Sequence, residues 1–138
     1  MAVPATSGVH DAVSRLMSWP VASVGMTATM REVTEALAAN EIGVAAVMAG
    51  DRFVGVVSER DVATHLAEGA NPDHLIVEEM VTLAPVTVSE GDTVLHAAYA
   101  MVDAGVRHVP VVDESGDVVG MVSLRDVAAV LLREVSRR

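Results

Sequence analysis

Residues 54–62 read VGVVSERDV, and residues 119–127 read VGMVSLRDV. When the chain is laid over itself at an offset of 65, Pro20–Leu66 aligns with Pro85–Leu131 without a gap. Most of the identical positions fall in and just after these two stretches, whereas chance similarity would be scattered, so we infer an internal repeat. A chain of 138 residues therefore holds two small repeats fused into one object rather than two full domains.

Hydrophobic periodicity changes in the same order in both repeats. Short extended segments, 21–24 and 86–89, precede helical spacing over 29–40 and 92–105. Two β-branched runs joined by a turn follow, at 43–49 and 53–58 and again at 108–113 and 118–123. A closing helix is predicted to begin near Glu59 and near Leu124. Each repeat is therefore predicted to be β-α-β-β-α.

The helix predicted over 92–105 places four apolar residues on one face and ends at a glycine suited to a left-handed C-terminal stop. These residues are Leu95, Ala98, Met101 and Val102, followed by Gly105.

The helices of one such repeat cover a single face of its sheet, so the other face stays apolar. We therefore predict an α+β fold in which two β-α-β-β-α repeats pack sheet to sheet with pseudo-two-fold symmetry. The predicted organisation is a flexible N-terminal tail at 1–8, a first repeat at 9–68, a linker at 69–74 and a second repeat at 75–138. Similar segments, VHDAVSRLM and HLIVEEM, precede the two repeats, and the latter is expected to begin a short helix.

Composition excludes several classes of function. The net charge is −10 and all nine basic residues are arginine, so the surface repels nucleic acid, and three aromatic residues offer no stacking platform for single strands. The chain has no cysteine, which excludes disulfides, cysteine-ligated metals and thiol catalysis. The sequence shows neither a secretory signal nor an apolar run of membrane-spanning length, so we expect a cytoplasmic protein.

The duplicated stretch carries polar residues where a strand is predicted to become a helix. Ser58 and Ser123 stand at this junction, where free backbone N–H groups favour a phosphate. Asp61 and Asp126 follow three residues later and can accept both hydrogen bonds of a ribose diol. The same Ser-x-x-Asp spacing is also close to a capping box, in which the serine and the acid only satisfy the helix start.

Other residues of the duplicated stretch also suit the binding of a nucleoside phosphate. Gly55 and Gly120 lack side chains and would let an adenine ring approach the strand. Arg60 and Arg125 could neutralise a phosphate or could simply lie on a solvated face.

GVVSERD at Gly55–Asp61 and GMVSLRD at Gly120–Asp126 resemble the signature of cystathionine β-synthase (CBS) domains, whose tandem pairs are called Bateman modules. The resemblance covers about residues 11–135. It implies a regulatory module, not an enzyme, that requires no cofactor. Such a module binds an adenosine-type ligand (AMP, ADP, ATP or S-adenosylmethionine) in clefts between the repeats and acts in trans on an unknown effector protein.

The resemblance also implies roles for residues outside the duplicated stretch. Basic residues just before the Pro-containing strand would reach phosphates, and the first strand segment would face the adenine. The residues at these places are Arg107, His108, Pro110, Val86 and Thr87. At the offset of 65 the first repeat has Ile42, Gly43 and Ala45 instead of Arg107, His108 and Pro110. We expect one site with Ser123, Asp126 and Thr87, and another with Ser58 and Asp61 that borrows Arg107 or His108.

The last helix is apolar on more than one side, at Leu124, Val127, Val130, Leu131 and Leu132, which predicts a homodimer.

A ligand-free interaction scaffold is the alternative function, with the serines and aspartates serving only as caps. Ser58, Asp61 and His65 lack the spacing of a hydrolytic triad, and His74 with Glu78 supplies too few ligands for a metal site.

Overall fold

The computed structural model describes residues 7–137, and residues 1–6 and 138 lie outside the described part. The chain divides into two compact units: unit 1 comprises the described parts of Met1–Val21 and Val86–Arg138, and unit 2 comprises Ala22–Pro85. Of the tail predicted at 1–8, the first six residues are outside the described part, whereas Ser7 is buried and the Gly8 N–H donates to Asp11 Oδ2 at 2.7 Å. Within the described residues, no helix is long and apolar enough to cross a membrane.

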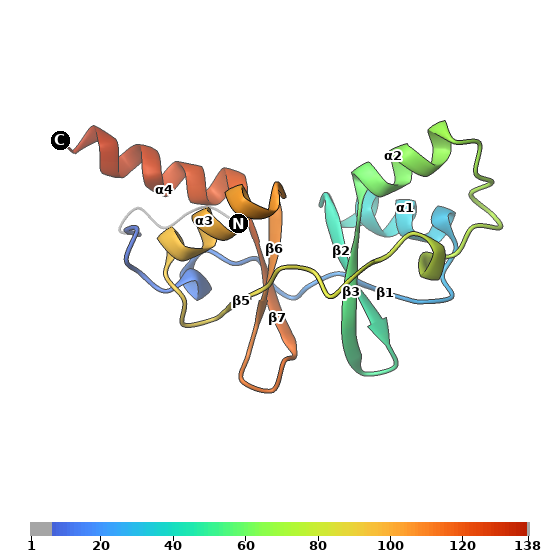
Figure 1. Ribbon diagram of the computed structural model, residues 1–138, viewed down its shortest axis with the longest axis horizontal. Helices are drawn as coiled ribbons and strands as arrows, with labels where there is room; N and C mark the ends of the chain where they lie inside the picture. The colour runs from blue at the N-terminus through green and yellow to red at the C-terminus, as the bar shows by residue number, and fades with distance from the viewer. Residues whose placement is uncertain (1–6, 138) are drawn as a thin grey trace. The chain divides into compact units, whose positions relative to one another are not determined.

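Unit 2 is a four-stranded sheet with two helices. Its strand order is β1-β2-β3-β4, with β1 parallel to β2 and the other pairs antiparallel. Its elements are β1 (Ser23–Gly25), α1 (Met30–Asn40), β2 (Val44–Ala49), β3 (Arg52–Ser58), α2 (Glu59–Ala67), the 3-10 helix η2 (Val77–Glu79) and β4 (Thr82–Leu83), as Figure 1 shows.

Unit 1 repeats this plan with a three-stranded sheet. Its order is β5-β6-β7, with β5 parallel to β6 and β6 antiparallel to β7. Its elements are the 3-10 helix η1 (Val13–Arg15), β5 (Val88–Ser89), α3 (Val94–Ala104), β6 (His108–Val112), β7 (Val118–Ser123) and α4 (Leu124–Ser136). The predicted α+β class and the β-α-β-β-α order are confirmed in both repeats, and the sheet-to-sheet packing stays a prediction.

Local chemistry explains where the first helix of each repeat begins and ends. Thr29 and Thr93 cap α1 and α3 by accepting the backbone N–H three residues later. Gly105 ends α3 in the left-handed conformation (φ 67°), as predicted, and Glu41 takes the same conformation (φ 52°) after α1.

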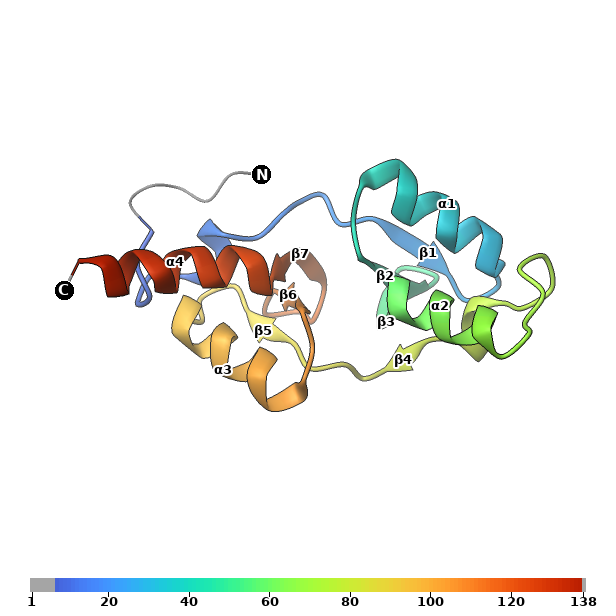
Figure 2. The same cartoon turned by 90° about the horizontal axis from the view of Figure 1, so that it is seen from above.

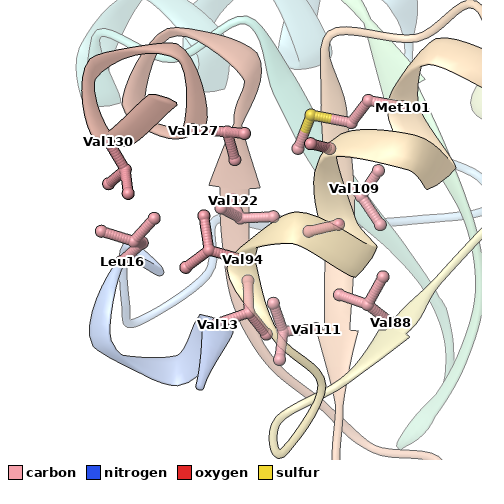
Figure 3. Close-up of a cluster of buried hydrophobic side chains, with 12 residues drawn as sticks. Val13, Leu16, Val88, Val94, Met101, Val109, Val111, Val122, Val127 and Val130 are labelled. Carbon is pink, nitrogen blue, oxygen red and sulfur yellow. The ribbon is translucent and has the colours of Figure 1, made fainter. Parts of the chain in front are cut away.

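Both helices of unit 1 pack on one face of its sheet. Figure 3 shows this core, in which valines of β5, β6 and β7 meet Val94 and Met101 of α3 and Val127 and Val130 of α4. The apolar face predicted for α3 included Val102, but this residue is 72% exposed. The buried face of α3 consists instead of Val94, Ala97, Ala98 and Met101.

The segment before each repeat packs in the unit formed by the other repeat. We call residues 12–18 and 76–83 the leading segments. Val13 and Leu16 belong to the core of unit 1, which contains the strands of the second repeat. Val77 and Met80 belong to the core of unit 2, which contains the strands of the first repeat. The repeat boundary predicted at 9 therefore does not coincide with a boundary between the compact units.

The leading segments also extend the two sheets. Ser18 bridges to Met121 of β7, and Thr82–Leu83 pair as β4 with Val56 and Gly55 of β3. These antiparallel pairings were not expected from the sequence. They supply backbone partners to the outer edge of β3 and of β7.

The linker predicted at 69–74 is tied to the start of α1. The Arg31 N–H donates to the Pro72 carbonyl oxygen at 2.9 Å, and the Met30 N–H donates to that of Leu75 at 2.8 Å. The Arg31 guanidinium also binds Asp73, with Nη2 at 3.1 Å from Oδ2, and this hydrogen bond lowers the pKa of the Asp73 carboxyl.

The two repeats are not related by one constant offset. The caps Thr29 and Thr93, and the strand starts Val44 and His108, correspond at an offset of 64, whereas Ser58 and Ser123 correspond at 65. The extra residue lies between β6 and β7, because five residues separate the paired residues Val112 and Val118, whereas four separate the equivalent pair Met48 and Phe53. The gapless alignment was therefore wrong by one residue upstream of this turn: Arg107 corresponds to Gly43, His108 to Val44 and Pro110 to Ala46.

Gly55 and Gly120 do not leave open space for a ligand, which corrects their expected role. A Cβ at Gly55 would meet the backbone carbonyl oxygen of Thr82, and a Cβ at Gly120 would meet the side chain of Met17. The two glycines therefore accommodate the leading segments that cross β3 and β7.

We expect Gly55→Ala to destabilise the protein by about 1–3 kcal/mol, because the added methyl group would push against backbone that cannot rotate away. Gly25→Ala is the matched control, since nothing lies within 4 Å of a Cβ at that strand position. Urea denaturation of both variants measures the difference. Equal stability of the two variants would show that the crossing at Gly55 is not tight.

Candidate ligand-binding site

The topology of unit 1 brings some of the predicted residues of the second repeat to one end of its sheet. The strand β6 begins at this end and the antiparallel strand β7 ends there (Figure 1), whereas β5 pairs with Val111 and Val112 at the other end of β6. His108 therefore begins β6 and Ser123 ends β7 at the same edge, whereas Thr87 directly precedes Val88, which pairs with Val111. We call this edge the Ser123 end.

Backbone contacts bring the two parts of the Ser123 end together. His108 and Ser123 are paired residues of β6 and β7. The Leu124 N–H, at the start of α4, donates to the carbonyl oxygen of Arg107 at 2.7 Å. Arg107 is thus fixed beside the start of α4 within unit 1, a contact that the sequence did not reveal.

The predicted residues differ in how far solvent reaches them. Ser123, Asp126 and His108 are partly buried, and Pro110 is buried within β6 opposite Met121, so it belongs to the sheet rather than to an accessible surface. The remaining predicted residues of this repeat are exposed: Val86, Thr87, Arg107 and Arg125.

Fewer backbone N–H groups are free at the start of α4 than the sequence predicted. The Asp126 N–H donates to Ser123 Oγ at 3.2 Å, and the Leu124 N–H is used by Arg107. The backbone N–H of Arg125 is the first-turn donor left for an anion. The carboxylate of Asp126 makes no hydrogen bond within residues 7–137, so both of its oxygens can accept hydrogen bonds from a ligand.

The equivalent place in unit 2 has a different arrangement. Asp61 Oδ2 accepts from the Ser58 N–H at 2.8 Å and from Ser58 Oγ at 3.0 Å, and the Asp61 N–H donates back to Ser58 Oγ at 3.2 Å. This is a complete capping box, so the capping interpretation holds for the first repeat. Gly43 takes the place of Arg107, with its carbonyl oxygen accepting from the Glu59 N–H at 2.9 Å, and Arg60 is exposed.

The sequence profile of the CBS domain family matches residues 13–68 and 77–133. The chain belongs to the CBS domain family. The two matched segments begin 64 residues apart and end 65 residues apart, in agreement with the longer turn in the second CBS repeat.

Solved CBS proteins share the fold over most of the chain. A CBS domain protein from Pyrobaculum aerophilum, PAE2072, complexed with AMP, is 37% identical with a TM-score of 0.83, covering 91% of this chain and 98% of that one. The CBS domain pair of protein MJ0100, in complex with 5′-methylthioadenosine and S-adenosyl-L-methionine, is 26% identical with a TM-score of 0.80, covering 87% and 98%.

Two curated relatives match over shorter stretches. An uncharacterized protein of Methanopyrus kandleri is 35% identical over 58% of this chain and 41% of its own length. The inosine-5′-monophosphate dehydrogenase of Korarchaeum cryptofilum is 36% identical over 59% of this chain and 16% of its own length. The CBS pair thus spans less than half the length of these relatives.

The structure describes the residues of the two constellations that the sequence analysis set aside. His65 Nδ1 lies 2.8 Å from the backbone carbonyl oxygen of Asp61, while the Asp61 carboxylate contacts Ser58 directly, so the ring does not bridge serine and acid. His74 and Glu78 are both exposed, and the described residues contain no group of three side chains arranged for a metal ion.

The different caps of the two CBS repeats predict different effects of the same substitution. Asp61→Ala should cost about 1 kcal/mol of stability more than Asp126→Ala, because only Asp61 bonds back to the N–H and hydroxyl of its serine. Both aspartates lie in the first turn of a helix, so the loss of a favourable helix-dipole interaction cancels in the comparison. Urea denaturation without ligand measures it, and equal losses would contradict the assigned caps.

Proposed function

We propose that this CBS pair is a regulatory module that binds an adenosine-type ligand at the Ser123 end of unit 1. The proposal rests on one observation. Arg107 lies beside the start of α4, where the Asp126 carboxylate makes no hydrogen bond within the described residues. The structures of PAE2072 with AMP and of MJ0100 with S-adenosyl-L-methionine support this class of ligand.

Each part of the proposed ligand has a chemical partner in unit 1. A phosphate would accept from the Arg125 N–H and face the Arg107 and Arg125 guanidinium groups. The Asp126 carboxylate would accept hydrogen bonds from both hydroxyl groups of the ribose diol. Val86 and Thr87, exposed before β5, are the candidate neighbours of the adenine. His108, the first residue of β6, is paired with Ser123 and is the remaining predicted ligand-binding residue of this repeat.

We propose that the equivalent place in unit 2, with Ser58, Arg60 and Asp61, is a weaker site. A ribose there would have to displace the two hydrogen bonds that the Asp61 carboxylate accepts from Ser58. Gly43 also contributes no charge where Arg107 stands in the other repeat. One ligand per chain is therefore expected at low ligand concentration.

Regulation would follow if the ligand prefers one state of the module, since a ligand shifts an equilibrium only by its difference in affinity between states. We propose that the CBS pair forms a homodimer in the cytoplasm and acts in trans on another protein, with no cofactor and no reaction of its own. A ligand-free interaction scaffold is the second candidate function, because Ser58 and Ser123 both cap helices in the structure.

Thermal unfolding with AMP, ADP, ATP, S-adenosylmethionine and NADH tests the proposal. A ligand at about 100 times its Kd adds about 2.7 kcal/mol, which corresponds to a rise in Tm of several degrees. ATP and S-adenosylmethionine separate the two classes of ligand, because only the nucleotide presents phosphate to Arg107. No shift with any of these at millimolar concentration would instead favour the scaffold.

Asp126→Asn should lower affinity at least tenfold, because the amide group removes the charge and one acceptor that face the ribose. Asp61→Asn is the matched control and should bind the first equivalent of ligand as the natural chain does. Isothermal titration calorimetry gives both affinity and stoichiometry. If Asp61→Asn loses the tight site and Asp126→Asn keeps it, the assignment to unit 1 is wrong.

A further inference from the structure

The first leading segment, residues 12–18, contacts the strand that ends at Ser123. The Ser18 N–H donates to the carbonyl oxygen of Met121 at 2.8 Å, and the Met121 N–H donates to that of Ser18 at 3.0 Å. Met121 stands two residues before Ser123 on β7, and the side chain of Met17 lies against the same strand. This segment therefore fixes the outer edge of β7 close to the Ser123 end.

The same segment packs against the first two turns of α4. Leu16 is 3% exposed and shares one buried cluster with Val127 and Val130 of α4. Figure 2 shows the segment, in blue, running along α4, and Figure 3 shows Leu16 close to Val130. Val127 directly follows Asp126, whose carboxylate is the proposed ribose acceptor. Loss of Leu16 from this cluster would therefore leave a cavity beside the helix start that carries the proposed site.

A third contact joins the first leading segment to the loop after β5. The Val13 N–H donates to the carbonyl oxygen of Asp92 at 2.7 Å, and the Ser14 N–H donates to that of Glu90 at 3.4 Å. This loop directly follows β5, and Thr87, a candidate neighbour of the adenine, directly precedes β5. The first leading segment thus contacts β7, α4 and the loop after β5, which carry or adjoin the proposed ligand-binding residues.

We propose that docking of the first leading segment on unit 1 is coupled to ligand occupancy of the Ser123 end, so that segment and ligand stabilise each other. The inference rests on the proposed function and names the two states that the ligand distinguishes, with the segment docked and with it released. Release removes Leu16 from α4 and the hydrogen-bonded partner from β7, so the site residues on both elements lose their fixed positions. A ligand that binds the docked state shifts the equilibrium towards it, and docking raises the affinity for the ligand by the same factor.

The first leading segment can be released without unfolding of the whole unit. The elements from β5 to α4 form one continuous stretch, 88–136, and supply every buried residue of the unit 1 core except Val13 and Leu16. Local opening of such a segment costs less free energy than global unfolding. Release would expose Val13, Leu16 and the core residues that they cover, which would give an effector protein a surface that depends on the ligand.

The second leading segment, residues 76–83, provides an internal control. It is similar in sequence to the first, but its buried residues Val77 and Met80 belong to the core of unit 2. Its strand, β4, pairs with β3 rather than with β7. Ligand bound at the Ser123 end should therefore leave the docking of the second leading segment unchanged.

Hydrogen–deuterium exchange of the natural chain with and without AMP, followed by NMR, tests the coupling. At about 100 times the Kd of AMP, the amide N–H groups of Val13, Ser14 and Ser18 should exchange at least about tenfold more slowly, because release then also requires loss of the ligand. The amide groups of the second leading segment should exchange at an unchanged rate. Unchanged exchange in the first leading segment when calorimetry shows AMP bound, or equal slowing in both segments, would overturn the proposal.

A second measurement needs no ligand. Leu16→Ala shortens a buried side chain of the first leading segment, and Met80→Ala is the matched control in the second, since the two residues are 3% and 5% exposed. Without ligand, Leu16→Ala should accelerate exchange of the Leu124 N–H, which donates to the Arg107 carbonyl oxygen, whereas Met80→Ala should not. Equal effects of the two variants would contradict the proposed support of the Ser123 end.

The coupling and the proposed function can fail separately in these experiments. A lack of AMP binding in the calorimetry counts against the proposed nucleotide site. Binding of AMP without the expected differences in exchange counts against the coupling alone. The comparison with and without AMP uses the natural chain, so it also decides the question if Leu16→Ala does not fold.

Discussion

The core of each unit closes only when the leading segment of the other repeat packs against it. Val77 and Met80 complete the core of unit 2, and Val13 and Leu16 complete the core of unit 1. Full burial of one such side chain is worth about 1.5–3 kcal/mol, so each pair represents a large share of the net stability of a small domain. This exchange also explains the glycine in each duplicated stretch, because Gly55 of β3 and Gly120 of β7 lie where a leading segment runs against the strand.

Much of the fold could be predicted because local signals agree with it. The change from period two to helical spacing located the strands and helices, and Gly105 marked the end of α3. The exchange of leading segments could not be predicted, because VHDAVSRLM and HLIVEEM are alike and either would suit either core. The offset of 64 in the first half of each repeat was missed because the identities lie after the turn whose length differs.

The candidate site was predictable in kind, and the sequence also showed that the first repeat lacks counterparts of Arg107, His108 and Pro110, but the difference between the two aspartates was not predictable. Both repeats read Ser-x-Arg-Asp, so the sequence cannot show that the Asp61 carboxylate binds Ser58 while the Asp126 carboxylate is unengaged within the described residues. The position of Arg107 depends on a backbone hydrogen bond to the start of α4, which leaves no mark on residue type. Side-chain orientation at the two aspartates therefore distinguishes the two repeats in addition to the replacement of Arg107 by Gly43.

The exchanged segments also determine the order in which the chain can fold as it is made. Unit 2 is one continuous stretch, Ala22–Pro85, so its core can form once Val77 and Met80 have left the ribosome. Unit 1 joins the two ends of the chain, and Val13 and Leu16 must wait for β6, β7 and α4, more than 90 residues later. The proposed ligand site belongs to unit 1, so it is completed after the core of unit 2.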